Sequence, residues 1–452
     1  SALAHSCVGA GSDNLSRLRA GVRGSSGNWD YTLAVADLQT DGVSAASEAA
    51  GNTEDDPWEN LTVSGRFGRS FLEDGRVDLA VRYTDGDNDI DGFTFGVGPS
   101  DDLNSEQARE TVTAGLTVTA PIRSWWTQTF YVGAGSDELI GTDPDDFFSN
   151  FDITSETGEI STQAELALSD NDTLTVGYRV EKREAENVGS FTESLYLRSF
   201  FAENQWSLQD RHHFTVSLRH DDHSVFGSET TYRVTSSLKL AENTRFHGSF
   251  GTGFKAPTFN DLYFPGFGNP DLAPETSEGF DLGLEQTLLD GRLTLDLTYF
   301  DNDFEDLILF TFPAGFVNVA TATSEGFEFS ARWEPTDQVL LQASHTYNET
   351  EDGDTGLQLA RRPEHRSAFY LAFDATDRLR GTASLIMVRD RIDSDGSDAD
   401  DYERLDLSLD YRATRLLKPY LRLENVLDED YSEVPGFTSP GFTAAVGLSV
   451  GL

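Results

Sequence analysis

Residues 77–83 read Val77-Asp-Leu-Ala-Val-Arg-Tyr83, with bulky apolar side chains at every second position. Successive side chains of a β-strand point to opposite faces, so this spacing gives one apolar face and one face that carries Asp78 and Arg82. Residues 293–299 and 404–411 repeat the pattern, with leucines and a closing tyrosine alternating with polar side chains. A repeated period of two predicts strands with one face in an apolar environment and the other in water.

The composition limits what that apolar environment is. The chain has 452 residues, of which 38% are hydrophobic, and its mean hydropathy is -0.41. No stretch approaches the ~18 consecutive apolar residues that a membrane helix needs. A membrane β-strand needs only ~10 residues with alternate positions apolar, so a helical membrane protein is excluded and a membrane barrel is not. The alternative is a soluble β-sandwich, which would have compact and even connections.

The connections are uneven, because short and long ones alternate along nearly the whole chain. The short turns lie near residues 24–27, 73–75, 169–172, 241–243, 290–291, 334–337 and 375–377. The long polar stretches span residues 38–59, 83–109, 134–158, 252–276, 300–323, 348–366, 388–402 and 425–440, with links of middling length at 182–190 and 220–230. Short periplasmic turns and long extracellular loops are typical of an outer-membrane barrel.

We therefore predict an all-β fold, a transmembrane antiparallel up-and-down β-barrel that forms a single domain over residues 1–452. The pattern accommodates about 22 strands of ~10 residues each, if residues 4–11 supply the first. An even number of strands places both chain ends on the periplasmic side. A barrel this wide encloses a lumen that side chains cannot fill, and transporters of this size carry a plug.

Charge and motifs exclude two classes of function. The chain has 33 basic and 78 acidic residues, a formal net charge of -45, so we expect no binding to nucleic acid. The acidity is explained either by solvated loops or by carboxylates that hold divalent cations. A Gly-x-Ser-x-Gly motif, a His-Glu-x-x-His motif and a Cys/His cluster with zinc spacing are all absent, so we do not expect an enzyme. Cys7 is the only cysteine, which excludes an intramolecular disulfide.

Four ordered elements in the second half of the chain carry a family resemblance. They are Gly251-Thr-Gly-Phe-Lys-Ala-Pro257 with the residues up to Tyr263, Gly268-Asn-Pro-Asp-Leu-Ala-Pro-Glu275, Asn318 to Phe329 around Glu325-Gly326, and Leu423-Glu-Asn-Val-Leu-Asp-Glu-Asp-Tyr431. Together they resemble TonB-dependent receptors of the bacterial outer membrane. Pro257, Pro270 and Pro274 cannot donate ladder hydrogen bonds, which places the first two elements in a loop. There they either support the loop or contact a ligand.

The resemblance implies an integral outer-membrane receptor, expected to be a monomer, that takes up a scarce nutrient such as cobalamin or a ferric siderophore. The family's N-terminal plug and its TonB-engaging segment do not occur in these 452 residues. We therefore expect energy coupling through the TonB complex only when a plug is present. Two alternatives are a plug-less channel for passive diffusion, similar to a porin, and a structural or adhesion barrel.

Within the family the resemblance is closest to cobalamin receptors, and it implies a calcium site. The acidic run at residues 51–56 and the run at residues 83–92 are similar to the two neighbouring loops that hold calcium there. Carboxylates on adjacent loops can converge on one hard cation, which takes six to eight oxygen ligands. Residue 98 is glycine where an EF-hand loop has glutamate, so an EF-hand is excluded. The predicted Ca²⁺ ligands are Asp55, Asp56, Asp85, Asp87, Asp89 and Asp91.

Aromatic residues are the second set of candidate site residues. A haem receptor would place a histidine between its two mid-barrel elements, and none lies between Phe254 and Pro274, which disfavours haem. Exposed aromatic rings could contact an apolar ligand, or they could only pack at the barrel rim. The predicted ligand contacts are Phe264, Phe267, Phe310, Phe312, Phe316 and Phe437.

Overall fold

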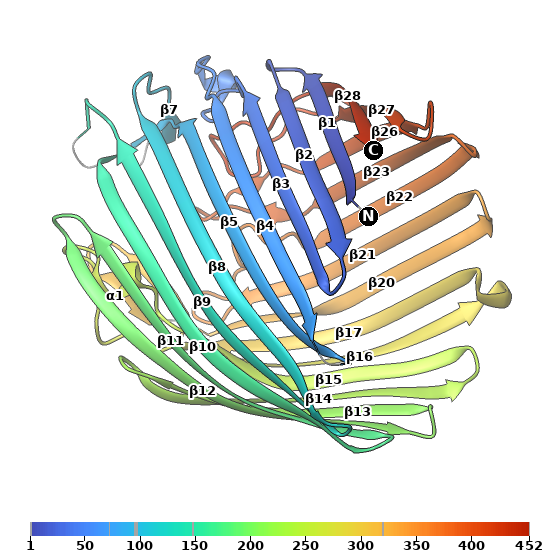
Figure 1. The fold of residues 1–452 in the computed structure, drawn as a ribbon. Helices are drawn as coiled ribbons and strands as arrows, with labels where there is room; N and C mark the ends of the chain where they lie inside the picture. The colour runs from blue at the N-terminus through green and yellow to red at the C-terminus, as the bar shows by residue number, and fades with distance from the viewer. Residues whose placement is uncertain (1, 72, 95–97, 147–148, 319–320, 452) are drawn as a thin grey trace.

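The computed structural model, which describes residues 2–71, 73–94, 98–146, 149–318 and 321–451, is a closed barrel of 22 antiparallel strands (Figure 1). The first half of the barrel consists of β1 Ala2–Gly11, β2 Ser16–Ser26, β3 Trp29–Thr40, β4 Trp58–Phe71, β5 Gly75–Asp89, β8 Glu106–Arg123, β9 Trp126–Thr142, β10 Phe151–Ser169, β11 Asp172–Asn187, β12 Phe191–Leu208 and β13 His212–His223. The second half consists of β14 Gly227–Ala241, β15 Thr244–Lys255, β16 Glu275–Leu288, β17 Leu293–Glu305, β20 Ala322–Thr336, β21 Val339–Asp352, β22 His365–Thr376, β23 Leu379–Arg389, β26 Tyr402–Tyr411, β27 Leu417–Glu424 and β28 Thr443–Gly451.

The barrel closes where the first strand meets the last. β1 pairs with β2 on one side and with β28 on the other, in a register that joins Cys7 to Ser449 and Gly11 to Ala445. Closure satisfies the backbone donors and acceptors that an open sheet edge would expose to lipid. The predicted fold class and strand number are confirmed, and the first strand begins at residue 2 rather than residue 4.

Connections sort by length between the two ends of the barrel. Ten turns lie at the end that holds both termini, at residues 27–28, 72–74, 124–125, 170–171, 209–211, 242–243, 289–292, 337–338, 377–378 and 412–416. Eleven loops lie at the other end, at residues 12–15, 41–57, 90–105, 143–150, 188–190, 224–226, 256–274, 306–321, 353–364, 390–401 and 425–442. We call this second end the extracellular end.

Several strands extend further than the sequence predicts. The predicted link 182–190 is mostly strand, because β11 and β12 stay paired as far as Asn187 and Phe191. The predicted link 220–230 is mostly strand as well, because β13 and β14 stay paired as far as His223 and Gly227. Likewise β5 runs to Asp89 inside the predicted loop 83–109. These extensions project into water, where both faces of a strand can be polar. The alternation that marks a membrane strand is therefore lost although the ladder continues.

The two faces of the barrel wall differ in polarity. Phe130 and Val132 on β9 are 51% and 50% exposed because they point away from the lumen, where no protein covers them. Their neighbour Tyr131 points inward to a row of polar side chains. Trp29, Trp125, Trp126 and Trp333 lie beside the short turns, as interfacial aromatic residues of membrane barrels do.

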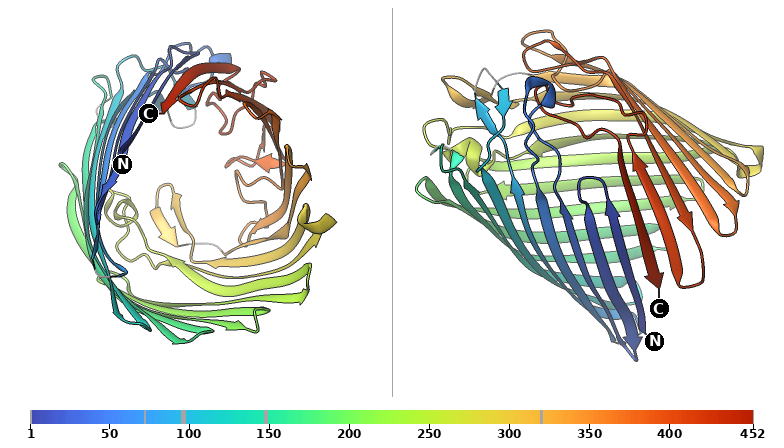
Figure 2. Two further views of the ribbon diagram at one scale, coloured as in Figure 1. Left: turned by 45° about the vertical axis from the view of Figure 1, so that its right-hand side comes forward. Right: turned by 90° about the horizontal axis from the view of Figure 1, so that it is seen from above.

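Shorter elements occupy the loops. They are the hairpins β6–β7 (Gly92–Thr94 and Gly98–Ser100), β18–β19 (Ile308–Thr311 and Gly315–Asn318) and β24–β25 (Arg391–Ile392 and Asp398–Ala399), the helix α1 (Phe259–Tyr263) and the 3-10 turns Glu48–Ala50 and Leu289–Gly291. Seen along the barrel, the segments around residues 260 and 310 project inside the ring of strands (Figure 2). No helix in the described part of the chain is long and apolar enough to cross a membrane.

Candidate functional site

The acidic loops 41–57 and 90–105 bring three carboxylates together at the extracellular end. One oxygen each of Glu54, Asp91 and Asp101 lies within 4.8 Å of the other two. Backbone N–H groups engage part of this cluster: the Thr53 N–H donates to Asp101 over 3.0 Å, and Ala46 N–H donates to Asp91. We call Glu54, Asp91 and Asp101, together with the adjacent Asp56, the acidic cluster.

The acidic cluster has oxygens that no protein donor satisfies. Glu54 Oε2 and Asp56 Oδ1 are buried and have no hydrogen-bond partner among the described residues. Burial, followed by repulsion from Asp56 and Asp91, raises the pKa of Glu54. Burial also raises the pKa of Asp56, although the hydrogen bond from Ala45 N–H opposes the shift. Carboxylates crowded out of water without cationic partners fit the oxygen ligands of a hard cation such as Ca²⁺.

The predicted metal ligands separate into two groups. Asp56 and Asp91 belong to the acidic cluster, and Asp89 is near enough to raise the pKa of Glu54. Asp55 is exposed. Asp85 and Asp87 lie on β5, in register with Leu61 and Glu59 of β4 and below the loops.

Glu54 and Asp101 were not among the predicted ligands. Glu54 lies inside the acidic run that was recognised. Asp101 lies ten residues beyond Asp91, at the far side of the β6–β7 hairpin. The pair Asp101-Asp102 is an acidic signal in the same loop, but only the folded loop shows which of the two turns toward Glu54.

A third loop is attached to the acidic cluster. Ala46 forms an isolated β-bridge with Phe437 in loop 425–442. Ser47 N–H donates to Gly436 O over 2.8 Å, and Thr438 N–H donates to Ala45 O over 2.9 Å. Since Asp56 and Asp91 accept from the N–H groups of Ala45 and Ala46, the same two residues join the acidic cluster to loop 425–442.

Five of the six predicted aromatic contacts meet in one cluster. The ring of Phe267 lies 6.5 Å from that of Phe264, 5.4 Å from Phe310 and 6.4 Å from Phe312, and Phe310 lies 5.3 Å from Phe316. Phe310 and Phe312 remain 51% and 75% exposed. These five residues, which we call the aromatic cluster, come from loops 256–274 and 306–321.

Phe437 lies away from the aromatic cluster, beside Ala46 and the acidic cluster. The structure therefore places the six predicted phenylalanines in two regions of the extracellular end. One region is aromatic and presents exposed rings, whereas the other is acidic.

The motif-bearing loop 256–274 holds the aromatic cluster in place. Its helix α1 begins at a capping box formed by Thr258 and Asp261. Leu262 and Leu272 are only 1% and 3% exposed, and Tyr263 and Phe259 pack against Phe191 at the end of β12. The amide of Asn269 donates to Phe316 O over 3.1 Å, which ties this loop to the β18–β19 hairpin. These contacts are structural, as one of the two sequence-based interpretations expected.

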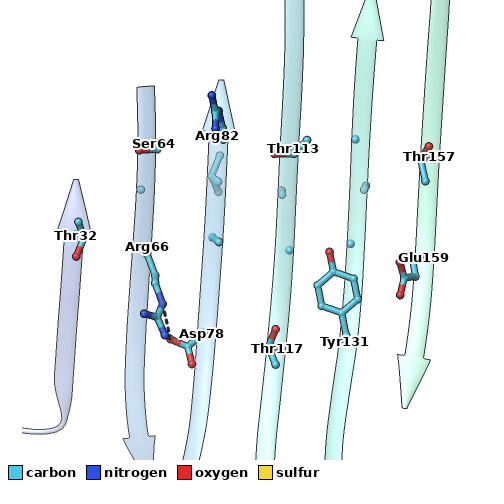
Figure 3. A pocket seen from close by; sticks show the side chains of 18 residues that line it. Thr32, Ser64, Arg66, Asp78, Arg82, Thr113, Thr117, Tyr131, Thr157 and Glu159 are labelled. Carbon is cyan, nitrogen blue, oxygen red and sulfur yellow. Dashed lines mark hydrogen bonds and ion pairs between the residues drawn. The ribbon is translucent and has the colours of Figure 1, made fainter. Parts of the chain in front are cut away.

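The inner wall of the barrel carries a hollow of about 760 Å³ along β3, β4, β5, β8, β9 and β10 (Figure 3). Its lining includes Thr113, Tyr131 and Glu159. Gly115 and Gly133 face the ring of Tyr131, and a Cβ on Gly133 would lie 2.2 Å from the Tyr131 hydroxyl oxygen. Arg66 and Asp78 form an ion pair of 2.8 Å at one side of the hollow. The hollow is lined by polar, charged and small apolar residues and opens toward the lumen, so it suits a segment that occupies the lumen.

Comparison with known proteins identifies the barrel. Residues 6–426 match the family model for "TonB dependent receptor-like, beta-barrel". The chain belongs to the TonB-dependent receptor family. It is therefore an integral β-barrel of the outer membrane, in a family of receptors and transporters rather than enzymes.

Relatives of this receptor barrel include two vitamin B12 transporters named BtuB. The one from Vibrio vulnificus is 33% identical over 244 residues, which are 53% of this chain and 38% of that protein. The one from Photobacterium profundum is 27% identical over 449 residues, which are 94% of this chain and 70% of that protein. The chain thus aligns with well under half of the first relative's length and about two thirds of the second's.

Solved structures share the fold at lower identity. The ferric-catecholate import receptor Fiu from Escherichia coli K12 superposes with a TM-score of 0.83 at 14% identity, covering 100% of this chain and 82% of that chain. The siderophore receptor PirA from Acinetobacter baumannii superposes with a TM-score of 0.83 at 17% identity, covering 100% and 80%. At these identities the likeness concerns the fold alone.

Proposed function

We propose that this TonB-dependent receptor barrel binds a scarce nutrient at its extracellular end and takes it up across the outer membrane. The candidate ligands are a cobalamin-like molecule and a ferric siderophore. The observation that carries the proposal is the exposed aromatic cluster, held by a loop whose sequence elements are those of the receptor family. Exposed phenylalanine rings are unfavourable in water, so a patch of them beside the lumen indicates a binding surface.

Transport through this barrel needs a segment in the lumen and a source of energy. We propose that a plug occupies the lumen and contacts the hollow on the inner wall, and that the TonB complex drives its movement. The barrel acts as a monomer in this scheme. A passive channel differs in one measurable respect, because an unplugged barrel of this width conducts ions steadily across a planar bilayer and a plugged receptor does not.

The binding proposal is tested by cyanocobalamin binding to outer membranes that contain the receptor. Phe312→Ala removes the most exposed ring of the aromatic cluster and is expected to weaken binding about tenfold or more, the loss typical of one buried aromatic contact. Phe442→Ala is the matched control, since Phe442 is 47% exposed but lies in loop 425–442 outside the cluster. Equal affinities of both variants and the wild type would refute the aromatic cluster as the binding surface.

We further propose that the acidic cluster binds Ca²⁺. Glu54, Asp91 and Asp101 would hold the ion, with Asp56 able to contribute the buried Oδ1 that lacks a protein donor. A bound cation would remove the repulsion among these carboxylates and order loops 41–57 and 90–105. Supporting this proposal are the orphaned oxygens of Glu54 and Asp56 and the absence of a basic residue from both loops.

A further inference from the structure

Charge in the extracellular loops is almost entirely of one sign. The eleven loops carry 27 acidic residues, three arginines and no lysine. The ten turns at the other end carry eight acidic and five basic residues. More than half of the formal net charge of -45 therefore belongs to the loops, which is where a ligand from outside first meets the protein.

The three loop arginines do little to offset this charge. Arg361 is in an ion pair of 2.6 Å with Asp393. Arg391 is only 7% exposed, lies over the ring of Tyr402 and donates to backbone carbonyls, among them Asp400 O over 2.6 Å. Among the described residues of the loops, Arg362 is the one arginine that is exposed and outside any ion pair. Within the described residues of the loops, an anionic ligand would thus find a single free guanidinium.

The acidic residues, in contrast, converge. A hollow of about 850 Å³ lies between loops 41–57, 390–401 and 425–442. Its lining includes six carboxylates, those of Glu48, Asp400, Asp401, Asp428, Glu429 and Asp430. Several of the loop carboxylates accept hydrogen bonds from neutral donors, as Asp428 does from Phe442 N–H over 2.9 Å. Such bonds satisfy the carboxylate without a cation, so they leave its negative charge uncancelled.

The aromatic cluster offers no compensating cation. Loops 256–274 and 306–321 contain no lysine, arginine or histidine, and their only charged residues are Asp261, Asp271 and Asp306. The proposed binding surface is therefore an apolar patch at the end of the barrel that carries the acidic loops. One-signed charge around a concave opening produces a potential of several kT, which enriches cations and slows the entry of anions.

We propose that the extracellular end selects ligands by charge, admitting neutral or cationic molecules and discriminating against anionic ones. The inference rests on the proposed function, because it names the class of ligand that the aromatic cluster receives. A ferric tris-catecholate complex is an anion and falls in the disfavoured class. A corrinoid, whose apolar macrocycle is edged by neutral amides, falls in the favoured class.

The local potential can be measured without knowing the ligand. On a Cys7→Ser background, Ser394→Cys places a thiol in loop 390–401 and Ser26→Cys places a matched thiol beside a turn at the opposite end. Both serines are exposed.

The protein in nonionic detergent is labelled with a cationic and an anionic methanethiosulfonate of similar size. At low salt we expect the cationic-to-anionic rate ratio at position 394 to exceed that at position 26 about tenfold. In ~1 M salt the two ratios should converge, because the screening length falls to ~3 Å. Equal ratios at low salt would overturn the proposal.

The ligand class is tested in a second arm. Cyanocobalamin and a synthetic ferric tris-catecholate are compared as ligands of the wild type and of an Asp395→Asn/Asp398→Asn variant at low salt. We expect only the catecholate to gain from the variant, by a few-fold in association rate. Tighter binding of the catecholate than of cyanocobalamin to the wild type would overturn the proposal. If neither ligand binds while labelling at position 394 remains charge-selective, the proposed receptor function fails and the charge selection stands.

Discussion

At the scale of single residues, neighbouring acidic residues of one loop differ in whether their carboxylates reach the acidic cluster. Glu54 and Asp55 are adjacent in the chain, but Glu54 turns into the cluster and Asp55 is exposed to water. Such neighbours make a matched pair of variants, because the same loop carries both changes.

Glu54→Gln is expected to lower Ca²⁺ affinity at least tenfold, since it removes a charged ligand from a site that has few others. Asp55→Asn is expected to change the affinity less than twofold. Calorimetric titration of the purified protein with Ca²⁺ measures both. A wild-type protein that releases no heat with Ca²⁺ would remove the calcium proposal altogether.

A second residue-scale prediction concerns the hairpin that carries the aromatic cluster. Gly315 and Gly356 both have positive φ, at 85° and 67°. A Cβ on Gly315 would lie 2.2 Å from Phe267 O, whereas one on Gly356 would meet nothing within 4 Å. Both alanine variants bear the ~1 kcal/mol cost of a left-handed backbone. Only Gly315→Ala also displaces Phe267, so it alone should impair cyanocobalamin binding. Equal binding by the two variants would contradict this account of the cluster.

At the scale of elements, the extracellular loops are joined in pairs and threes. Loop 425–442 is joined to the acidic cluster through Ala45 and Ala46, because these two residues pair with loop 425–442 and also donate hydrogen bonds to Asp56 and Asp91. A cation in the cluster should therefore influence a loop that supplies none of the predicted ligands.

Removal of Ca²⁺ is expected to expose loop 425–442 to proteolysis. A glutamate-specific protease can cut after Glu433 in this loop and after Glu364 in loop 353–364. Loop 353–364 connects β21 and β22 and shares no hydrogen bond with the acidic cluster among the described residues. With a chelator, cleavage after Glu433 should accelerate several-fold while cleavage after Glu364 stays constant. Equal acceleration at both positions would indicate that the chelator loosens the extracellular loops in general, and not that it releases loop 425–442 from the acidic cluster.

The ion pair between Arg361 and Asp393 joins loops 353–364 and 390–401 and gives a pH dependence. The Arg361 guanidinium lowers the pKa of Asp393 below its ordinary 3.8. A depressed carboxyl pKa means that the ion pair contributes stability above pH 3.8 and loses it as the pH falls through the depressed value.

Hydrogen exchange of the two loops should thus be unchanged from pH 7 to pH 5, after correction for the intrinsic rate. Asp393→Asn should speed exchange at pH 7, whereas Asp395→Asn, at a position without a basic partner, should not.

At the scale of the whole molecule, the seam between the first and last strands decides whether the sheet is a barrel. Cys7 and Ser449 are directly opposed across this seam. Opposed residues of antiparallel strands have Cα atoms ~4.5–5.5 Å apart, within the range that a disulfide spans. The single native cysteine therefore offers a direct test of closure.

Ser449→Cys is expected to form a disulfide with Cys7 under oxidation, whereas Leu448→Cys, whose side chain points to the other face, is not. The cross-link joins the chain near its two ends, so it should shift the mobility of the denatured protein on a non-reducing gel. A cross-link from position 448 instead of 449 would place the seam in a different register.

Much of this fold is readable in the chain because β-structure has a period of two. Val77 to Tyr83 already separate a lipid face from a lumen face, and the alternation of short and long connections orders the strands into a barrel. The strand extensions as far as Asp89 and Asn187 were not predictable in this way, because strands in water need no alternation. The sequence elements that resemble the receptor family correctly predicted a loop at residues 256–274. Its prolines cannot donate the hydrogen bonds of a β-ladder, whatever residues surround them.

Local periodicity and composition were enough to predict where the membrane-spanning strands lie, which of their faces meet lipid and that the long loops are acidic. Only the tertiary structure decided that Asp101 joins Glu54 while Asp55, Asp85 and Asp87 do not. It also decided that Phe264 and Phe267 meet Phe310 while Phe437 lies beside the acidic cluster. Loops have no period that sets the direction of a side chain, so their partners are determined by the barrel that brings distant loop ends together.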